Sequence, residues 1–461
     1  MSQPSASRRA FLQRSAMLSM AGVAAPWALN LATMAEAAAQ SSGTTDYKAL
    51  VCVFLQGGND HANTVLPYDL SAHQAYAQAR GSLALSRQSL AGTLLGSAPG
   101  GEVLALAPAL APLHAEYQSG RLAALLNIGP LVQPTTLAAY RAGSVPLPPK
   151  LFSHNDQQSM WQSYGPEGST AGWGGRTADL LLEDNGLASL TCINAAGSAV
   201  YLAGQEAVPY MINPAGPAEV SALGSPFGMF GSAACREALR QIITQTTQPH
   251  VLASEHARIT ARALDVNAQL RSALAAQPVL ATPFNNDNPL AKQLRMVARL
   301  LQARASLGMR RQVFFVQLGG FDLHDNLRSQ HPVLLGRVAE ALVQFQQAVD
   351  ALGLAPQVTT FTASDFGRTL SSNGDGSDHG WGAHHLVMGG AVRGRALYGQ
   401  WPGAGLGGPQ DVGQGRLLPT TSVQQLAVAL ARWMGVSTPD LAMVAPGYDA
   451  FDASTLSGLL A

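Results

Sequence analysis

Carboxylate and imidazole side chains follow directly after an apolar run in this sequence. Residues 313–318 are mostly apolar, β-branched or aromatic, two glycines come next, and Asp322 and His324 stand just beyond them. The composition of the run predicts a buried central strand, and the glycines predict a sharp turn at its end. Asp322 and His324 are separated by one residue, so in extended backbone both side chains point to the same face. Oxygen and nitrogen donors in that arrangement can bind a divalent metal ion.

The same arrangement occurs at two other places. Residues 50–56 lead through two glycines to Asp60, and residues 357–363 lead to Asp365. Ligands of α/β proteins bind beyond the carboxyl ends of the parallel strands, so we expect these carboxylates to meet Asp322 at one edge of the sheet. Asp60 and Asp365 are therefore predicted metal ligands.

Each of these residues has a structural alternative. Asp60 could be a turn residue, which is common after two glycines. Asp365 could form a buried ion pair with Arg368; in the functional interpretation Arg368 instead faces a phosphate or sulfate, which suits its planar guanidinium. His379 stands among glycines in a loop, where it has little to pack against, and we predict it as a further ligand.

Ser153 is the candidate nucleophile. The sequence from Ser153 to Asp156 has the Ser-x-x-Asp spacing of a helix N-terminus. A hydroxyl at that position lies in a field that favours anions and could attack an ester if a metal ion lowered its pKa. A purely structural capping role is the alternative, and His154 or Asp156 could equally be the functional residue of this segment.

The N-terminus predicts an export signal. Residues 7–13 read Ser-Arg-Arg-Ala-Phe-Leu-Gln, a twin-arginine motif, and a weakly apolar run then leads to the small residues 37–39. We expect residues 1–39 to be a cleaved twin-arginine signal peptide, with a retained membrane anchor as the alternative. Export through the twin-arginine translocase would place the mature chain in the periplasm or outside the cell, and no later segment is apolar over the length of a membrane span.

The bulk composition excludes some classes of partner. The chain has 28 basic and 28 acidic residues, so nucleic acid and anionic membranes are not expected as partners. None of the three cysteines, Cys52, Cys192 and Cys235, has metal-ligand spacing with another Cys or His. Cys52 and Cys192 lie inside strand-like runs, where small buried side chains are expected.

The order of apolar patterns predicts a single α/β domain. Strand-like runs alternate with helical stripes, which predicts a doubly wound, largely parallel sheet flanked by helices. The domain would cover residues 45–461, with insertions around 196–232 and 264–288, the second of which we expect to be flexible. The strand candidates are 49–56, 121–128, 189–195, 312–319, 357–363 and 385–389, and the clearest helices are 289–307, 332–352 and 421–434.

Taken together, the motifs resemble the exported bacterial family called domain of unknown function 1501, over nearly the whole chain. That family is similar to the alkaline phosphatase and sulfatase superfamily. The resemblance implies an alkaline-phosphatase-like core with loop insertions and a metal site at the strand ends. The motifs that carry it are Gly57-Gly-Asn-Asp60, Gly172-Trp-Gly-Gly-Arg176, Gly319-Gly-Phe-Asp-Leu-His324, Ser364-Asp-Phe-Gly-Arg-Thr369 and Asp378-His-Gly380.

The sequence also departs from that superfamily. Phe366 stands where the superfamily commonly has a metal-binding histidine, which puts a two-metal site in doubt. The Ser-x-Pro-x-Arg frame that sulfatases need for formylglycine is missing around Ser144 and Ser153. A serine hydrolase of the nucleophile-elbow type would need Gly-x-Ser-x-Gly, which does not occur.

These observations predict an exported metal-dependent hydrolase of phosphate or related esters, holding one or two divalent ions, with Zn²⁺ or Mn²⁺ favoured. Ser153 would be the nucleophile, and Arg368 or Arg176 would bind the anion of a small ester substrate. The metal ligands would be Asp60, Asp322, His324, Asp365 and His379. The alternative is a non-catalytic exported binding or assembly protein with a degenerate metal site and an exported partner.

Overall fold

A computed structural model describes residues 46–224, 228–247 and 250–461. The predicted signal peptide, residues 1–39, lies outside these ranges. The chain divides into two compact units, Met1–Tyr47 and Lys48–Ala461. The α/β architecture belongs to the second unit. None of the described helices is both long enough and apolar enough to cross a membrane.

A nine-stranded sheet forms the centre of this unit, with the order β11-β5-β10-β9-β1-β8-β6-β7 and with β12 paired to β5. Only β10 runs antiparallel to its neighbours β5 and β9; the other pairs are parallel, as predicted. The strands are β1 (Lys48–Leu55), β5 (Leu122–Gly129), β6 (Cys192–Asn194), β7 (Tyr210–Met211), β8 (Arg311–Leu318), β9 (Val358–Ser364), β10 (Ala383–Gly389), β11 (Ala396–Gly399) and β12 (Thr421–Ser422).

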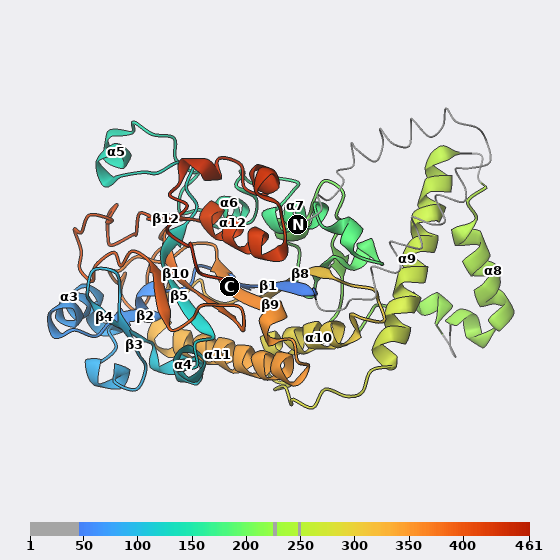
Figure 1. Cartoon of the computed structure of the whole chain (residues 1–461), viewed down its shortest axis with the longest axis horizontal. Coiled ribbons are helices and arrows are strands. Elements are labelled where there is room, and N and C mark those ends of the chain that lie inside the picture. Colours follow the sequence, from blue (N-terminus) through green and yellow to red (C-terminus); the bar gives the residue numbers. More distant parts are fainter. Residues whose placement is uncertain (1–45, 225–227, 248–249) are drawn as a thin grey trace, which may run out of the picture. The chain divides into compact units, whose positions relative to one another are not determined.

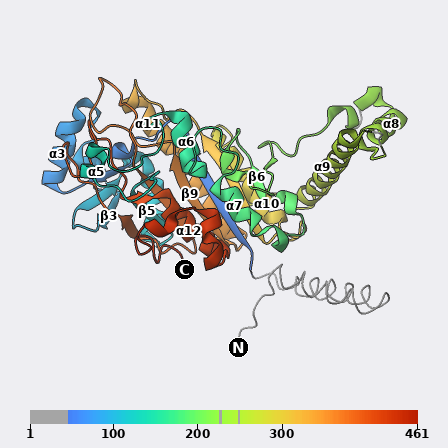
Figure 2. The same cartoon turned by 90° about the horizontal axis from the view of Figure 1, so that it is seen from above.

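Helices cover both faces of the sheet, which confirms the predicted α/β class. Figures 1 and 2 show α4 (Ala111–Gln118), α10 (Pro289–Ala303) and α11 (Leu327–Ala351) on one side, and α6 (His154–Ser163), α7 (Trp173–Asp179) and α12 (Val423–Met434) on the other. The remaining helices are α3 (Leu70–Arg80), α5 (Leu137–Ala142), α8 (Ala233–Thr244), α9 (Val251–Ala275) and α13 (Leu441–Val444).

The central strands are buried on both faces, and most of their residues are apolar or small. β5, β9 and β10 are buried along their whole length, and β1 is buried except at its first residue. Cys52 and Cys192 are buried free thiols in β1 and β6, as their positions predicted. Ser422 and Gln425 form a capping box at the start of α12, and Gly435 ends that helix with a positive φ.

Three features differ from the expectations. Residues 264–275 belong to α9, because their alanines, leucines and glutamine are good helix formers. α11 begins at Leu327, so Pro332 lies inside the helix and not at its start. A separate antiparallel sheet of β2 (Val65–Pro67), β3 (Leu94–Ser97) and β4 (Val103–Leu106) has strands too short to stand out in the sequence.

The fold brings three strand ends to the same level. Leu55, the last residue of β1, is paired with Leu318 at the end of β8 and with Ser364 at the end of β9. The loops that carry Asp322 and Asp365 therefore start side by side at one edge of the sheet.

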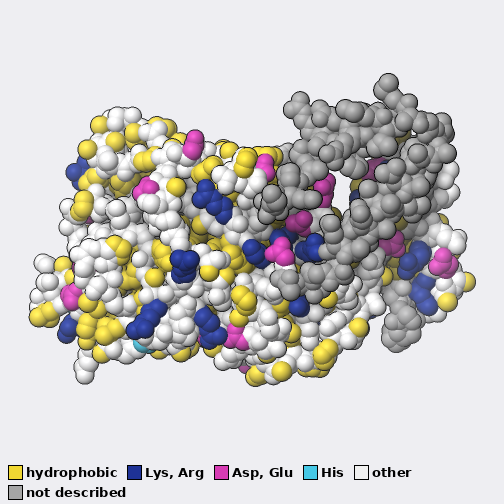
Figure 3. Space-filling view, in the orientation of Figure 1, with side chains coloured by type: hydrophobic (Ala, Val, Ile, Leu, Met, Phe, Trp, Pro, Cys, Tyr) yellow, Lys and Arg dark blue, Asp and Glu magenta, His cyan; other side chains and the backbone are white. Residues whose placement is uncertain are grey.

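On the face shown in Figure 3, acidic and basic side chains are dispersed and form no patch of one sign.

Gly57 lets two of these loops touch. Its φ is +115°, and a Cβ built on it would lie 2.4 Å from the backbone nitrogen of Asp322. We predict that Gly57→Ala destabilises the protein by at least about 2 kcal/mol, since the side chain meets backbone and the φ is unfavourable. Gly336→Ala in α11 is the control: its Cβ would meet nothing within 4 Å, so urea denaturation should show little change or a small gain in stability. Equal stability of the two variants would contradict this prediction.

Candidate metal centre

Four side chains from separate parts of the chain meet beyond the strand ends. The Asp322 carboxylate has one oxygen 3.3 Å from His154 Nε2 and the other 3.2 Å from His324 Nε2 and 3.4 Å from His379 Nε2. The Nε2 atom of His379 is also 3.1 Å from that of His154 and 2.8 Å from that of His324. Tetrahedral ligands about 2.0–2.1 Å from a zinc ion are roughly 3.3 Å apart. The separations are therefore those of atoms that share one cation.

The outer nitrogens of the imidazoles are held by acceptors. His154 Nδ1 lies 2.7 Å from the Asp365 carboxylate, and His379 Nδ1 lies 2.7 Å from the carbonyl oxygen of Phe152. A carbonyl can only accept, so the neutral His379 carries its proton on Nδ1 and turns the lone pair of Nε2 to the centre. His324 Nδ1 is 3.3 Å from Asp378. Histidines that bind metals are oriented in this way by carboxylates and carbonyls.

Asp365 and Arg368 contact the candidate ligands and hold them in position. Asp365 is fully buried. Its carboxylate also accepts hydrogen bonds from the backbone amide of Gly57 at 3.1 Å and from the side-chain amide of Gln158 at 2.8 Å. Arg368 is fully buried as well, and its Nη1 donates to Asp322 at 3.0 Å. Asp365 thus fixes the ring of His154, and Arg368 fixes the carboxylate of Asp322.

The pKa shifts of Asp322 and His379 favour metal binding, whereas that of His154 opposes it. Burial raises the pKa of Asp322, but the hydrogen bond from Arg368 and the charges of His154, Arg368 and His324 outweigh it, and the net pKa is lowered. Burial is the main reason that the pKa of His379 is lowered. The hydrogen bond to Asp365 raises the pKa of His154 against the opposing effect of burial. An ionised carboxylate and a neutral imidazole are the forms that bind a metal ion.

The residues present fit one divalent cation. Among the described residues, His154, Asp322 and His379 form the group whose ligand atoms all lie within 4.8 Å of one another, and His324 adds a fourth candidate through its contacts with two of them. Mixed nitrogen and oxygen donors favour Zn²⁺ or Mn²⁺. Phe366 is fully buried, and its ring centre lies 4.8 Å from those of His154 and His379. An apolar ring therefore lies beside His154 and His379, where a second ion would need a polar ligand.

Comparison with known families now identifies the chain. The family described as "Protein of unknown function (DUF1501)" matches residues 47–448. The chain belongs to this family. The predicted family resemblance is therefore confirmed for the part of the chain that the family covers.

Solved structures similar to this DUF1501 chain include two proteins of low sequence identity. Ps i-CgsB, solved in complex with k-i-k-neocarrahexaose, is 9% identical with a TM-score of 0.35, covering 89% of this chain and 78% of its own. The PsFucS1 sulfatase from Pseudoalteromonas sp. is 10% identical with a TM-score of 0.30, covering 90% of this chain and 72% of its own. Comparison with curated proteins gives no match.

The structure brings together three of the five predicted metal ligands of this DUF1501 chain, Asp322, His324 and His379. Asp365 does not lie among these ligand atoms, but its carboxylate is hydrogen-bonded to His154. Asp60 lies elsewhere: its carboxylate is ion-paired with Arg80 of α3, and both side chains are buried. Arg80 also donates to the carbonyl of Thr369 at 3.1 Å. The contacts of Asp60 are thus those of a structural ion pair.

The predicted nucleophile Ser153 lies beside the centre but is engaged elsewhere. It is the N-cap residue of α6, directly before His154, and its hydroxyl donates to Asp156 at 3.0 Å. It makes no side-chain capping bond to the helix backbone. Ser153 therefore does not cap the helix with its side chain, and its hydroxyl is bonded to a carboxylate.

The two arginines predicted to bind the substrate donate hydrogen bonds to groups of the protein itself. Besides Asp322, the Arg368 guanidinium donates to the carbonyls of Gly57 and Ser377. Arg176 donates to three backbone carbonyls, those of Ser163, Ala171 and Val444. Arg368 acts on the centre through Asp322, whereas Arg176 makes no contact with its ligands among the described residues.

Two residues of the site are not among those predicted from the sequence. His154 was weighed only as an alternative to Ser153, because the Ser-x-x-Asp spacing has a sufficient explanation as a helix start. Arg416 carries no motif at all, yet its Nε donates to the carbonyl of His379 at 2.7 Å. Its guanidinium also lies over the ring of Phe152, 5.0 Å from the ring centre, so it stands at the rim of the centre.

Proposed function

We propose that this protein is an exported, metal-dependent hydrolase of phosphate or related esters, with one ion in its centre. The observation that supports the proposal most directly is the convergence of three imidazole Nε2 atoms on the Asp322 carboxylate. Three imidazoles whose lone pairs face one point repel each other unless a cation or a proton lies between them.

The residues have distinct roles in this proposal. His154, His324, His379 and Asp322 hold the ion, and Asp365 and Arg368 orient two of these ligands. A divalent ion held there acts as a Lewis acid toward an ester oxygen. Arg416 takes the anion-binding role, since it makes no ion pair with any described residue and its Nη2 has no described hydrogen-bond partner.

The exposure of the centre suits a substrate that arrives from solvent. The side chains of Asp322 and His324 are 45% and 40% exposed, whereas their supports Asp365 and Arg368 are fully buried. The buried layer gives a rigid base, and the exposed layer leaves ligand positions within reach of an ester.

The commitment of Ser153 to Asp156 favours a second function, a non-catalytic exported binding protein that keeps the metal site. The two functions separate in one series of measurements. Mature protein is analysed for bound metal, then assayed against aryl phosphates, phosphodiesters and aryl sulfates before and after chelation and reloading with Zn²⁺ or Mn²⁺. Turnover that is lost on chelation and returns on reloading supports the hydrolase. About one ion per chain without turnover supports the binding protein, and a protein that binds no metal contradicts both.

We predict that Ser153→Ala retains turnover within about tenfold of the unchanged protein, because its hydroxyl is directed to Asp156. A true nucleophile would lose several orders of magnitude. Thr136→Ala is a matched control, since Thr136 caps α5 with its side chain on the Ala139 amide. Steady-state kinetics and thermal unfolding of both variants separate chemistry from the small cost of a lost hydroxyl contact. A loss above a thousandfold in Ser153→Ala alone would restore it as the nucleophile.

A further inference from the structure

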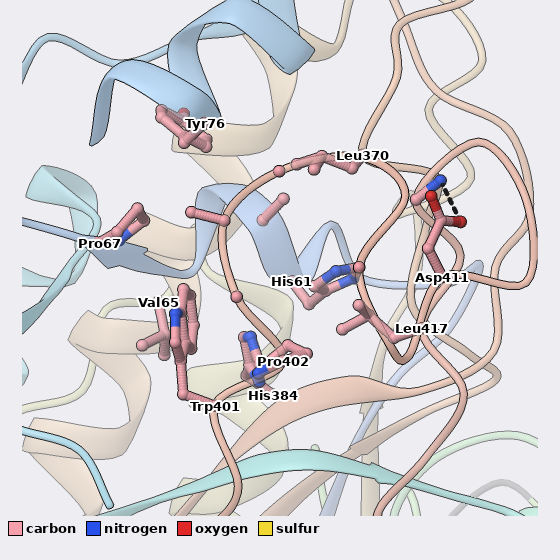
Figure 4. A pocket seen from close by; sticks show the side chains of 16 residues that line it. His61, Val65, Pro67, Tyr76, Leu370, His384, Trp401, Pro402, Asp411 and Leu417 are labelled. Carbon is pink, nitrogen blue, oxygen red and sulfur yellow. Dashed lines mark hydrogen bonds between the residues drawn. The ribbon is translucent and has the colours of Figure 1, made fainter. Parts of the chain in front are cut away.

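Two buried histidines line a cavity that the proposed reaction does not use. The cavity encloses about 30 Å³ between the turn at His61–Asn63, β2, α3 and the loop 401–417, and Figure 4 shows its lining. A single ordered water needs about 10–15 Å³ of such space, so about two water-sized groups fit. Its apolar wall includes Ala62, Val65, Pro67, Leu370 and Leu417.

The tautomers of both histidines follow from their neighbours. The Arg368 amide donates to His61 Nδ1 at 3.3 Å, and the Asn127 amide donates to His384 Nδ1 at 3.0 Å. Burial lowers the pKa of both rings, that of His384 to about 3, so both are neutral. A neutral ring that accepts at Nδ1 must carry its proton at Nε2. Neither Nε2–H has a hydrogen-bond partner among the described residues.

A third donor completes the set. Trp401 stacks on His384 with ring centres 5.3 Å apart and also lines the cavity. Its Nε1 is buried and has no hydrogen-bond partner among the described residues. Buried polar groups are nearly always hydrogen-bonded, so three N–H donors at one small cavity indicate a partner that supplies acceptors.

The side chains of the cavity that could accept are already engaged. Tyr76 donates its hydroxyl to Asn63 and accepts from the Leu85 amide. The Asp411 carboxylate accepts from the backbone amides of Gly407, Gly413 and Gly415. Figure 4 shows one of its hydrogen bonds as a dashed line. The lining side chains thus offer donors without free acceptors.

We propose that this cavity, which we call the His61–His384 cavity, binds a small monovalent anion of halide or formate size. Such an anion has only lone pairs and can accept from all three N–H groups. A single water molecule accepts only two hydrogen bonds, so one water cannot satisfy all three donors.

The test uses bromide as the probe. Crystals of the mature protein grown in sodium bromide should show an anomalous scattering peak between His61, His384 and Trp401. In solution, bromide and formate should raise the unfolding midpoint of the metal-free protein at an ionic strength held constant with sulfate, which is too large for the cavity. Because the chelated protein is used, the result does not depend on the metal centre or on turnover.

Trp401→Phe removes one donor and keeps the ring that stacks on His384. We expect bromide affinity to fall by about tenfold or more, the usual effect of losing a hydrogen bond to a charged partner. Trp433→Phe is the matched control, since it removes an indole N–H at a different cavity, next to Arg432 and Tyr448, and should leave bromide affinity unchanged. Water in place of a bromide peak, or equal bromide affinity in the two variants, would overturn the proposal.

Discussion

Replacing Asp322 by asparagine should abolish stable metal binding. Asp322 contacts all three imidazoles of the centre, and an amide is a much weaker ligand because it carries no charge. Loss of a residue that only orients a ligand costs about 10–100-fold in metal affinity. Loss of the central charged ligand should therefore exceed about 100-fold. Asparagine keeps an acceptor for Arg368, so the fold is preserved.

Metal analysis and thermal unfolding measure this effect together. A ligand present at about 1,000 times its dissociation constant stabilises the folded state by about 4 kcal/mol. Chelation should thus lower the unfolding midpoint of the unchanged protein and leave that of Asp322→Asn where it is. Asp325→Asn is the control, since Asp325 is the same residue type three positions on, is exposed, and contacts none of the ligands. If both variants respond to chelation as the unchanged protein does, the metal lies elsewhere.

The strands that carry the site were predictable because their sequences admit few alternatives. β1 and β8 are largely apolar runs and β9 is rich in threonine, and each is followed within five residues by a carboxylate. The carboxyl ends of parallel strands lie at one edge of the sheet. The strand topology therefore predicts that Asp322 and Asp365 lie near that edge. Which of the two carboxylates contacts all three imidazoles does not follow, because it depends on the side-chain packing of the loops.

The region between β7 and α10 shows a different limit. Its composition predicted a flexible insertion at 264–288, but residues 264–275 belong to the helix α9, and the helix α8 precedes it. α8 has no fully buried residue, and only Arg236, Leu239, Ile243 and Thr244 are partly buried, so packing distinguishes it little from a polar loop. Helix propensity alone indicates such an element, and it is a weak predictor beside packing.

The prediction of Asp60 as a metal ligand did not include its ion pair with Arg80, which no sequence pattern indicates. Arg80 ends α3, 20 positions further on, and nothing in its surroundings predicts that it returns to the turn after β1. The structure buries both side chains, with Asp60 1% and Arg80 0% exposed. Buried arginines require compensation, and Asp60 with the carbonyls of Thr369 and Leu370 supplies it.

Replacing Asp60 by alanine should therefore damage stability and spare the metal. Removing one partner of a buried ion pair costs about 3–5 kcal/mol, because the other charge stays buried without compensation. The folded fraction should still bind the same amount of metal as the unchanged protein, with unchanged affinity. A ligand role predicts the opposite result, a protein of nearly normal stability after chelation that no longer holds its ion. Denaturant unfolding and metal analysis of the folded fraction distinguish these outcomes.

A double-mutant cycle with Arg80 makes the distinction sharper. Asp60→Ala combined with Arg80→Ala removes both charges, so the double variant should be more stable than the sum of the single losses implies, with a coupling energy of about 1–3 kcal/mol. One oxygen of Asp60 has no hydrogen-bond partner among the described residues, which leaves room for a further contact there. If the cycle shows no coupling and Asp60→Ala alone loses the metal, that oxygen is a ligand and the centre holds more than the single ion proposed.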